Sequence, residues 1–183
     1  LVLNAAASNT IGGTGSLNLG TGELQVNNQN HEILSTADLT LTGDISIASG
    51  ISLTNNGSLT VSGDVTGTDG TSYWTNGSNA TLNIDGTFLT TGVLNAYSTG
   101  NTVNYNGTTA QTIKNPSSST YYNLTCSGAS GSATKSMASD LDINGNLTIS
   151  GTDILDATGT NYKINLAGNW SNYSTAGFSE QNG

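Results

Sequence analysis

The sequence predicts an all-β fold, namely a parallel β-helix (β-solenoid) with coils of about 20–23 residues and almost no helix. Three observations predict it. Short segments alternate apolar and polar residues, as strands with one buried face do. Each segment runs into a glycine, and the segments recur at a nearly constant spacing. A unit of this length cannot bury its own apolar side, so copies must stack.

The repeat is clearest between Thr81 and Gly107, where it occurs twice in succession. Leu82 and Ile84 precede Gly86, and Val103 and Tyr105 precede the next glycine in the same way. The pattern is Φ-x-Φ-x-Gly-x-Φ, where Φ is an apolar residue. The glycine indicates a corner, where the chain bends or a neighbouring backbone comes close.

The same pattern recurs along almost the whole chain. Its corner glycines are Gly22, Gly43, Gly63, Gly86, Gly107, Gly145 and Gly168. Their spacings are 21, 20, 23, 21, 38 and 23 residues, and we interpret the 38-residue gap as two coils of 19. The apolar residues two and four places before the glycines form the predicted core stack: Leu39, Leu41, Leu59, Val61, Leu82, Ile84, Val103, Tyr105, Leu141, Ile143, Ile164 and Leu166.

The repeats predict one domain over residues 1–183, with nine or so coils. Residues 1–37 are less regular, because Leu17 and Leu19 lie one place out of phase, as a bulge or an end coil would give. A looser coil is expected near residues 114–138, with its strand at Tyr121–Cys126. A sandwich or barrel would not require the same pattern at every second or third strand. Disorder is disfavoured by the regular apolar columns.

Two stretches resemble a known kind of repeat. Residues 100–113 with 121–125, and then Leu141–Ile149 with Leu166–Trp170, are similar to the β-helical repeat regions of large bacterial surface adhesins and autotransporter-like proteins, of the type common in Bacteroidota. The resemblance covers roughly residues 38–183. It implies a β-helical stalk, adhesin or filament wall outside the cell, and it implies no catalytic residues.

Charge excludes several classes of partner. Three basic residues and no arginine stand against twelve acidic ones, which gives a net charge of −9. Nucleic acids and anionic membrane surfaces both require a basic face. No apolar run approaches the length of a membrane-spanning helix, so no membrane insertion of this segment is expected. Leu1–Leu3 lacks the features of a signal peptide, and a mature product or an internal fragment is expected.

Few side chains suggest chemistry. The single cysteine, Cys126, is expected to pack as a small apolar residue, with an intermolecular role as the alternative. His31 is expected in a solvated turn. With only one histidine, a zinc site or a Ser-His-Asp triad cannot be assembled from the usual parts. We therefore predict no enzyme activity and no cofactor.

Carboxylates provide the alternatives. Asp44 and Asp64 follow equivalent glycines in adjacent coils, where they either share a proton or a cation or simply point at solvent. A close carboxylate pair would suit a polysaccharide-active β-helix enzyme. The run from Asp140 to Asn146 places oxygen ligands at alternate positions, which makes Ca²⁺ a candidate, although the twelve-residue calcium loop is absent.

The positions between the apolar columns predict ladders of hydroxyls and amides on the outside. Three places before the glycines are Thr40, Thr60, Asn83, Asn104, Asp142 and Asn165; one place before are Thr42, Ser62, Asp85, Asn106 and Asn144. Such a face suits glycan or ice binding, or it only keeps a structural rod soluble.

The function predicted is therefore that of a secreted, extracellular structural protein: a rod in a bacterial surface adhesin or filament. Neither end shows a cap, so head-to-tail self-association is expected, or continuation of the rod in the same polypeptide. Glycans and host or neighbouring cell surfaces are the other expected partners. A polysaccharide-active enzyme and a glycan- or ice-binding module are the alternatives.

Overall fold

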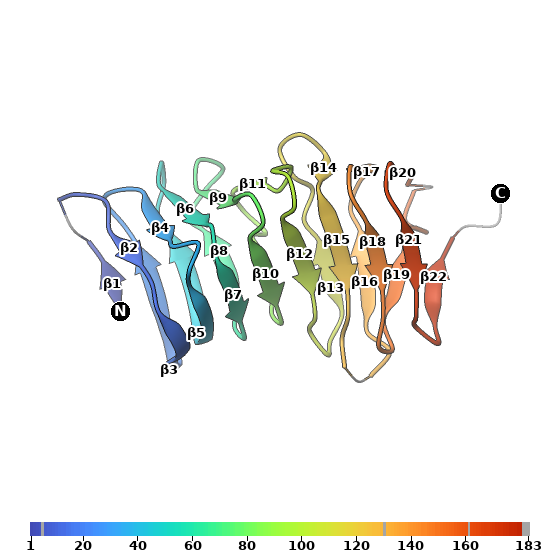
Figure 1. Ribbon diagram of the computed structural model, residues 1–183, viewed down its shortest axis with the longest axis horizontal. Coiled ribbons are helices and arrows are strands. Elements are labelled where there is room, and N and C mark those ends of the chain that lie inside the picture. The colour runs from blue at the N-terminus through green and yellow to red at the C-terminus, as the bar shows by residue number, and fades with distance from the viewer. Residues whose placement is uncertain (5, 130, 161, 181–183) are drawn as a thin grey trace.

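The computed structural model describes residues 1–4, 6–129, 131–160 and 162–180. Within these ranges the chain is all β, without helix, and its parallel strands stack as a β-solenoid of about eight turns. The predicted fold class is confirmed. Figure 1 shows the coils following one another along the long axis from the N-terminus to the C-terminus. No helix suited to crossing a membrane occurs in the described part of the chain.

The longest sheet runs the length of the rod and contains ten strands. Each strand pairs in parallel with the equivalent strand one coil away. In spatial order its strands are β1 (Val2–Leu3), β3 (Thr14–Val26), β5 (Asp38–Ile47), β7 (Ser58–Val61), β10 (Thr81–Ile84), β12 (Thr102–Tyr105), β15 (Asn123–Cys126), β18 (Leu147–Ile149) and β21 (Trp170–Asn172), with β8 (Val65–Gly67) paired to β5.

Three shorter sheets complete the coils. The first contains β2 (Thr10–Ile11), β4 (His31–Ile33), β6 (Ser52–Asn55), β9 (Tyr73–Asn76) and β11 (Val93–Asn95). The second contains β14 (Thr120–Tyr121), β17 (Leu141–Ile143) and β20 (Ile164–Leu166). The third contains β13 (Gln111–Ile113), β16 (Thr134–Met137), β19 (Ile154–Asp156) and β22 (Gly177–Ser179).

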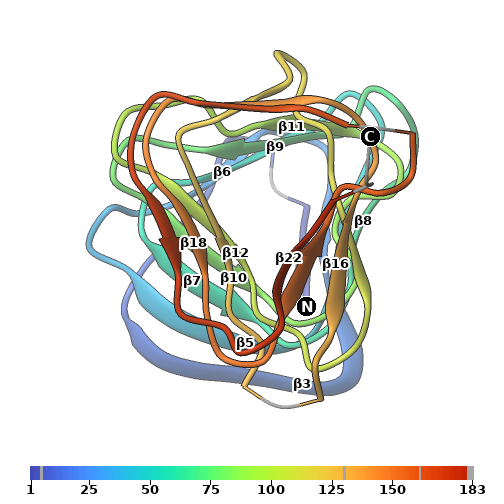
Figure 2. The ribbon, with the colours of Figure 1, turned by 90° about the vertical axis from the view of Figure 1, so that its right-hand side faces the viewer.

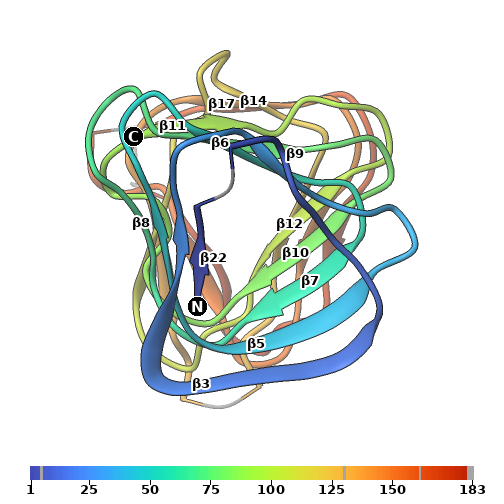
Figure 3. The same cartoon turned by 90° about the vertical axis from the view of Figure 1, so that its left-hand side faces the viewer.

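Viewed along the axis, the rod is roughly triangular (Figures 2 and 3). Face 1 is formed by β7, β10, β12, β15, β18 and β21 with the first halves of β3 and β5. Face 2 is formed by the β2–β11 sheet and continues into the β14–β20 sheet through the bridge between Ala96 and Tyr121. Face 3 is formed by β1, the second halves of β3 and β5, β8 and the β13–β22 sheet. Each coil therefore supplies one segment to each face.

On face 1, the strand register of the N-terminal half of the chain places the core residues in the two columns that the repeat predicts. Leu41, Val61, Ile84 and Tyr105 are successive partners, as are Leu39, Leu59, Leu82 and Val103. All of these side chains are buried except Leu39, which is partly buried and packs against the core. Because buried and outward-facing residues alternate along each strand, the buried side chains form one continuous interior through four coils.

The assignment after Gly107 is wrong for four residues of the predicted stack. Val103 and Tyr105 are followed on face 1 by Leu124 and Cys126, and then by Leu147 and Ile149. The residues Leu141 and Ile143 lie on face 2, where they pair with Ile164 and Leu166. Leu141 and Ile143 are buried, whereas Ile164 and Leu166 are only partly buried.

The glycine series divides in the same way. Gly107 is followed at its corner by Gly128 and Gly151, each of which approaches the carbonyl oxygen of the previous one, whereas Gly145 and Gly168 lie at the corner between faces 2 and 1. The 38-residue gap is therefore not two coils of 19 residues. The same apolar–glycine sequence pattern is used at two corners.

The irregular N-terminal region contains a bulge. The four residues Leu19–Gly22 of β3 lie opposite the single residue Gly43 of β5, and the register is restored at Glu23 and Asp44. Gly43 has a φ of 124°, which favours glycine, and an added Cβ would lie 2.5 Å from the Gly22 carbonyl oxygen. The out-of-phase residues Leu17 and Leu19 reflect this bulge.

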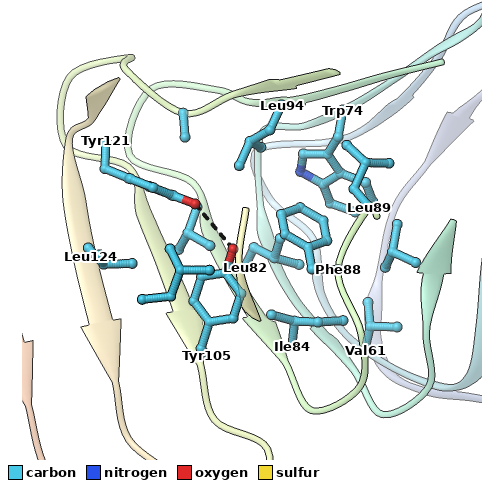
Figure 4. Packing of buried hydrophobic residues seen from close by; sticks show 14 of the residues in the cluster. Val61, Trp74, Leu82, Ile84, Phe88, Leu89, Leu94, Tyr105, Tyr121 and Leu124 are labelled. Atoms are coloured by element: carbon cyan, nitrogen blue, oxygen red, sulfur yellow. Dashed lines mark hydrogen bonds between the residues drawn. The ribbon is translucent and has the colours of Figure 1, made fainter. Parts of the chain in front are cut away.

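Aromatic side chains fill the middle of the rod (Figure 4). The ring of Phe88 meets that of Trp74 edge-on at 5.6 Å and that of Tyr105 at 6.3 Å. The hydroxyls of Tyr105 and Tyr121 lie 3.1 Å apart, and both bond the backbone of Lys114. Trp74, Phe88 and Tyr105 come from three successive coils, so these contacts connect faces 1, 2 and 3 through the interior of the rod.

Truncating Ile84 to alanine is expected to lower the free energy of unfolding by about 2–5 kcal/mol, because its side chain is fully buried in mid-column and the cavity cannot close. Denaturant unfolding followed by circular dichroism measures the loss. Asn83→Ala is the matched control, since Asn83 lies on the outer side of the same strand and its loss should be much smaller. Equal losses from the two variants would contradict the assignment of inner and outer positions.

Candidate functional site

The outer side of face 1 carries a ladder of polar side chains. Thr40, Thr60, Asn83, Asn104, Thr125 and Thr148 are successive partners in register. The Asn104 amide donates to Asn83 Oδ1 at 3.0 Å, and the Asn83 amide donates to Thr60 Oγ1 at 3.2 Å. Of the residues predicted for this column, Asp142 and Asn165 lie instead on face 2, where Asn165 donates to Asp142 at 2.7 Å.

The predicted positions one place before the glycines behave differently. The Thr42 hydroxyl donates to Asn18 across coils, and the Asp85 carboxyl has its pKa raised by burial. Asn106 has a buried Oδ1 with no hydrogen-bond partner among the described residues, and Ser62 is exposed. Asn144 follows β17 on face 2 and is exposed. These residues do not form a single ladder.

Asp44 and Asp64 lie at the corner between faces 1 and 3. The backbone N–H of Asp64 donates to Asp44 Oδ1 at 2.8 Å, and the N–H of Thr87 in the next coil donates to Asp64 Oδ1 at 2.6 Å. Both residues are exposed. Each carboxylate therefore accepts a hydrogen bond from the next coil along the chain. The two residues help to join the coils at this corner.

The glycines at that corner are in close contact with their neighbours. An added Cβ at Gly63 would lie 2.4 Å from the Gly43 carbonyl oxygen and 2.2 Å from Asp44 Oδ1. At Gly86 it would lie 2.4 Å from the Gly63 carbonyl oxygen and 2.6 Å from Asp64 Oδ1. The corner repeat thus requires glycine because the backbones of successive coils approach within a side chain's width.

A second polar ladder lies inside the corner between faces 2 and 1. Asn55, Asn76 and Asn101 are fully buried. Asn55 donates to Asn76 Oδ1 at 2.8 Å and to the Thr81 carbonyl at 3.0 Å, and Asn76 donates to the Thr102 carbonyl at 3.0 Å. These amides bond one another and the carbonyls of Thr81 and Thr102, the first residues of β10 and β12, so hydrogen bonds compensate for their burial.

A buried charged cluster lies inside the corner between faces 1 and 3. Lys135 Nζ donates to the Gly107 carbonyl at 2.6 Å, to Gln111 Oε1 at 2.7 Å and to the Thr109 carbonyl at 3.2 Å. It lies 3.6 Å from Asp153 Oδ2, and both side chains are 0% exposed. The Gly128 N–H donates to the same oxygen at 2.6 Å, while Asp153 Oδ1 has no partner within the described residues.

Burial dominates the electrostatics of this cluster. It lowers the pKa of Lys135 and raises the pKa of Asp153, although the charge of each partner acts in the opposite direction. Burial also raises the pKa of the nearby Cys126 thiol to about 12, and the charge of Asp153 adds to that shift. The cysteine is therefore a protonated thiol at neutral pH, packed in the core column between Tyr105 and Ile149.

The prediction of a solvated His31 is wrong. His31 begins β4 in the inward phase and is 2% exposed. Its Nδ1 accepts from the backbone N–H of Asn9 at 3.0 Å, and its Nε2 lies 3.2 Å from the Asn27 carbonyl. Both ring nitrogens are used by the backbone, which explains how a histidine can occupy a core column.

The oxygen-rich run from Asp140 to Asn146 also joins coils. Asp140 Oδ1 accepts from the N–H of Lys163 at 2.8 Å, and Asn146 Oδ1 accepts from the N–H of Asn169 at 3.0 Å. Within the described ranges, no group of three or more His, Cys, Asp or Glu residues is placed to hold a metal. Calcium binding at this run stays a prediction.

A cavity of about 330 Å³ opens on face 3 where its sheet is interrupted between β8 and β13. Phe88, Ile113 and Lys114 line it together with the hydroxyls of Thr87, Thr90 and Thr112. Burial lowers the pKa of Lys114. This hollow places the apolar side chains of Phe88 and Ile113 beside Lys114.

The sequence analysis missed the buried polar residues. Lys135 and Met137 share the inward phase of β16, and Asn55 and Asn76 share that phase with Leu53 and Trp74. A polar residue at an apolar phase position is the signal that could have identified them.

Comparisons with known proteins give no further information on the site. No family model, no curated protein and no solved structure matches the chain.

Gly86→Ala is expected to lower the free energy of unfolding by about 1–3 kcal/mol, because the new methyl group must displace the backbone of the coil below. Gly70→Ala is the matched control, since no atom lies within 4 Å of a Cβ added there, and its effect should stay within about 0.5 kcal/mol. Thermal unfolding of the two variants measures the difference. Similar stability of the two variants would show that the close contact at the corner does not contribute to the free energy of unfolding.

Proposed function

We propose that the chain is an extracellular structural rod, a β-solenoid segment of a bacterial surface adhesin or filament that joins further coils at its ends. It acts through shape and rigidity, without catalysis. The observation that carries the proposal is the continuous parallel stacking of the long sheet from β1 to β21, in which the register shifts at the β3–β5 bulge. Such a stack holds its two ends at a fixed separation.

Contacts between coils support the rigidity. Successive coils are joined by the backbone ladder of the long sheet, by shorter ladders on faces 2 and 3, by the Asn83–Asn104 ladder outside and by the Asn55–Asn76 ladder inside. Bending the rod would stretch all of these bonds on one side at once. A stalk or filament needs this property, and the resemblance of the repeats to surface adhesins agrees with it.

The two ends of the described rod support further stacking. At one end Leu1 and Val2 are 57% and 50% exposed, and at the other Trp170 and Tyr173 are 43% and 76% exposed. The strands β20, β21 and β22 each pair on one side only. Unpaired parallel edges beside exposed apolar side chains are suited to another coil, from the same polypeptide or from a second copy.

Residues 1–183 are expected to form end-to-end assemblies whose length rises with concentration, visible by light scattering and electron microscopy. Trp170→Lys should reduce this association, because it places a charge at the open edge of the last coil. Tyr97→Lys is the matched control, since Tyr97 is 54% exposed on a loop between the ends and should leave association unchanged. A monomer at every concentration, with both end coils protected from hydrogen exchange, would contradict the stacking.

A second candidate function is glycan binding on face 1. The hydroxyl and amide column from Thr60 to Thr148 is partly exposed and in register, so it repeats a hydrogen-bonding unit at each coil, roughly every 4.8 Å. A linear polysaccharide offers hydroxyls that such a row can bond. Ice binding by the same column stays a prediction.

Affinity electrophoresis in gels containing neutral polysaccharides tests this candidate. Retardation is expected to be lost in the double variant Asn83→Val, Asn104→Val, which removes the amides without touching the core. The matched control changes Asn95 on face 2 to Val. Unretarded wild-type protein would contradict glycan binding, and release of sugar would favour the polysaccharide-active enzyme instead.

A further inference from the structure

The Lys135–Asp153 pair connects adjacent coils inside the rod. Lys135 lies in β16 and Asp153 immediately precedes β19, and these two strands are neighbours in the face 3 sheet. Their side chains are 0% exposed, with Nζ 3.6 Å from Oδ2. Water is excluded, and the two reactive groups are held together by the pairing of their strands.

Burial disfavours the charged form of each partner, lowering the pKa of Lys135 and raising the pKa of Asp153, and proton transfer between them would leave an amine beside a carboxylic acid with no buried charge. Nζ donates to three carbonyl oxygens, and a neutral amine with two N–H groups can keep the two short bonds, to the Gly107 carbonyl and to Gln111 Oε1, while giving up the 3.2 Å bond to the Thr109 carbonyl. The nitrogen lone pair is then left for the carboxyl carbon of Asp153.

The carboxyl group is arranged for attack at its carbon. The Gly128 N–H donates to Oδ2 at 2.6 Å and would stabilise negative charge that develops there. The other oxygen, Oδ1, has no partner within the described part of the chain and can leave. The charge of a second carboxyl group, Asp85, also acts on Lys135 and raises its pKa.

We propose that Lys135 and Asp153 condense to an intramolecular isopeptide bond that crosslinks two successive coils. The Nζ–Cγ bond forms and the Cγ–Oδ1 bond breaks. Oδ1 leaves as water, with its own proton and one proton from the amine. Oxidation states do not change, and no metal, nucleotide or second substrate is consumed.

The condensation removes a cost of the unreacted pair. Two buried charges are expensive to desolvate, whereas a neutral amide keeps a donor and an acceptor for the same surroundings. The one N–H of the new amide can donate to the Gly107 carbonyl or to Gln111 Oε1, and the Gly128 N–H can donate to the new carbonyl oxygen. The crosslink also ties residues 135 and 153 together across one coil, so this part of the rod cannot unwind.

Intact-mass spectrometry of the purified 1–183 chain in denaturant tests the proposal. The mass is expected to fall below that of the sequence by one water molecule. The chain has lysines only at 114, 135 and 163 and no arginine, so trypsin should cut after Lys114 and Lys163. It should not cut after Lys135, which leaves peptide 115–163 intact and one water lighter.

Two variants complete the test. Asp153→Ala should show the full mass of its own sequence and cleavage after Lys135. Lys163→Met is the matched control and should keep the loss of water, because Lys163 is outside the cluster. Full mass and cleavage after Lys135 in the wild-type protein would overturn the proposal and identify an ordinary buried ion pair. Loss of water with normal cleavage after Lys135 would overturn it as well, since the loss would then lie elsewhere.

Discussion

Backbone hydrogen bonding between successive coils is the interaction on which the rest of this structure depends. Strands pair with the equivalent strands one coil away, so a residue in the middle of a sheet lies between residues of equivalent position in the neighbouring coils. This spacing forces glycine into the corners, where Gly86 passes the Gly63 carbonyl oxygen without room for a methyl group. It also allows outward polar side chains to bond one coil away, as between Asn83 and Asn104. Core, corners and surface all follow from one constraint.

The same constraint explains the polar interior. At the corners, buried polar side chains bond backbone carbonyl groups inside the rod. Buried asparagines supply donors at the corner between faces 2 and 1, while Gln111 and Lys135 supply them at the corner between faces 1 and 3. Gln111, for example, donates to the Gly86 carbonyl at 2.7 Å. The buried amine of Lys135 at this corner is paired with the carboxyl group of Asp153.

Much of the fold could be predicted from sequence because strand phase and corner glycines both depend on short segments. The columns through Leu82 and Ile84 are of this kind. Gly145 could not be assigned, because Leu141 and Ile143 precede it with the same spacing that is used on face 1, and only the three-dimensional path separates the two corners. His31 and Lys135 were missed for another reason. Polar residues in a core column are stabilised by backbone groups from distant coils, such as the N–H of Asn9 and the carbonyl of Gly107, which no local pattern reveals.

Methyl-to-methyl nuclear Overhauser contacts in the isotope-labelled protein test the stacking most directly, since they report which side chains are neighbours. The account predicts contacts from Leu82 to Leu59 and Val103, and from Leu124 to Leu147. Contacts from Val103 to Leu141 in place of Leu124 would contradict the register, and with it the order in which the coils stack.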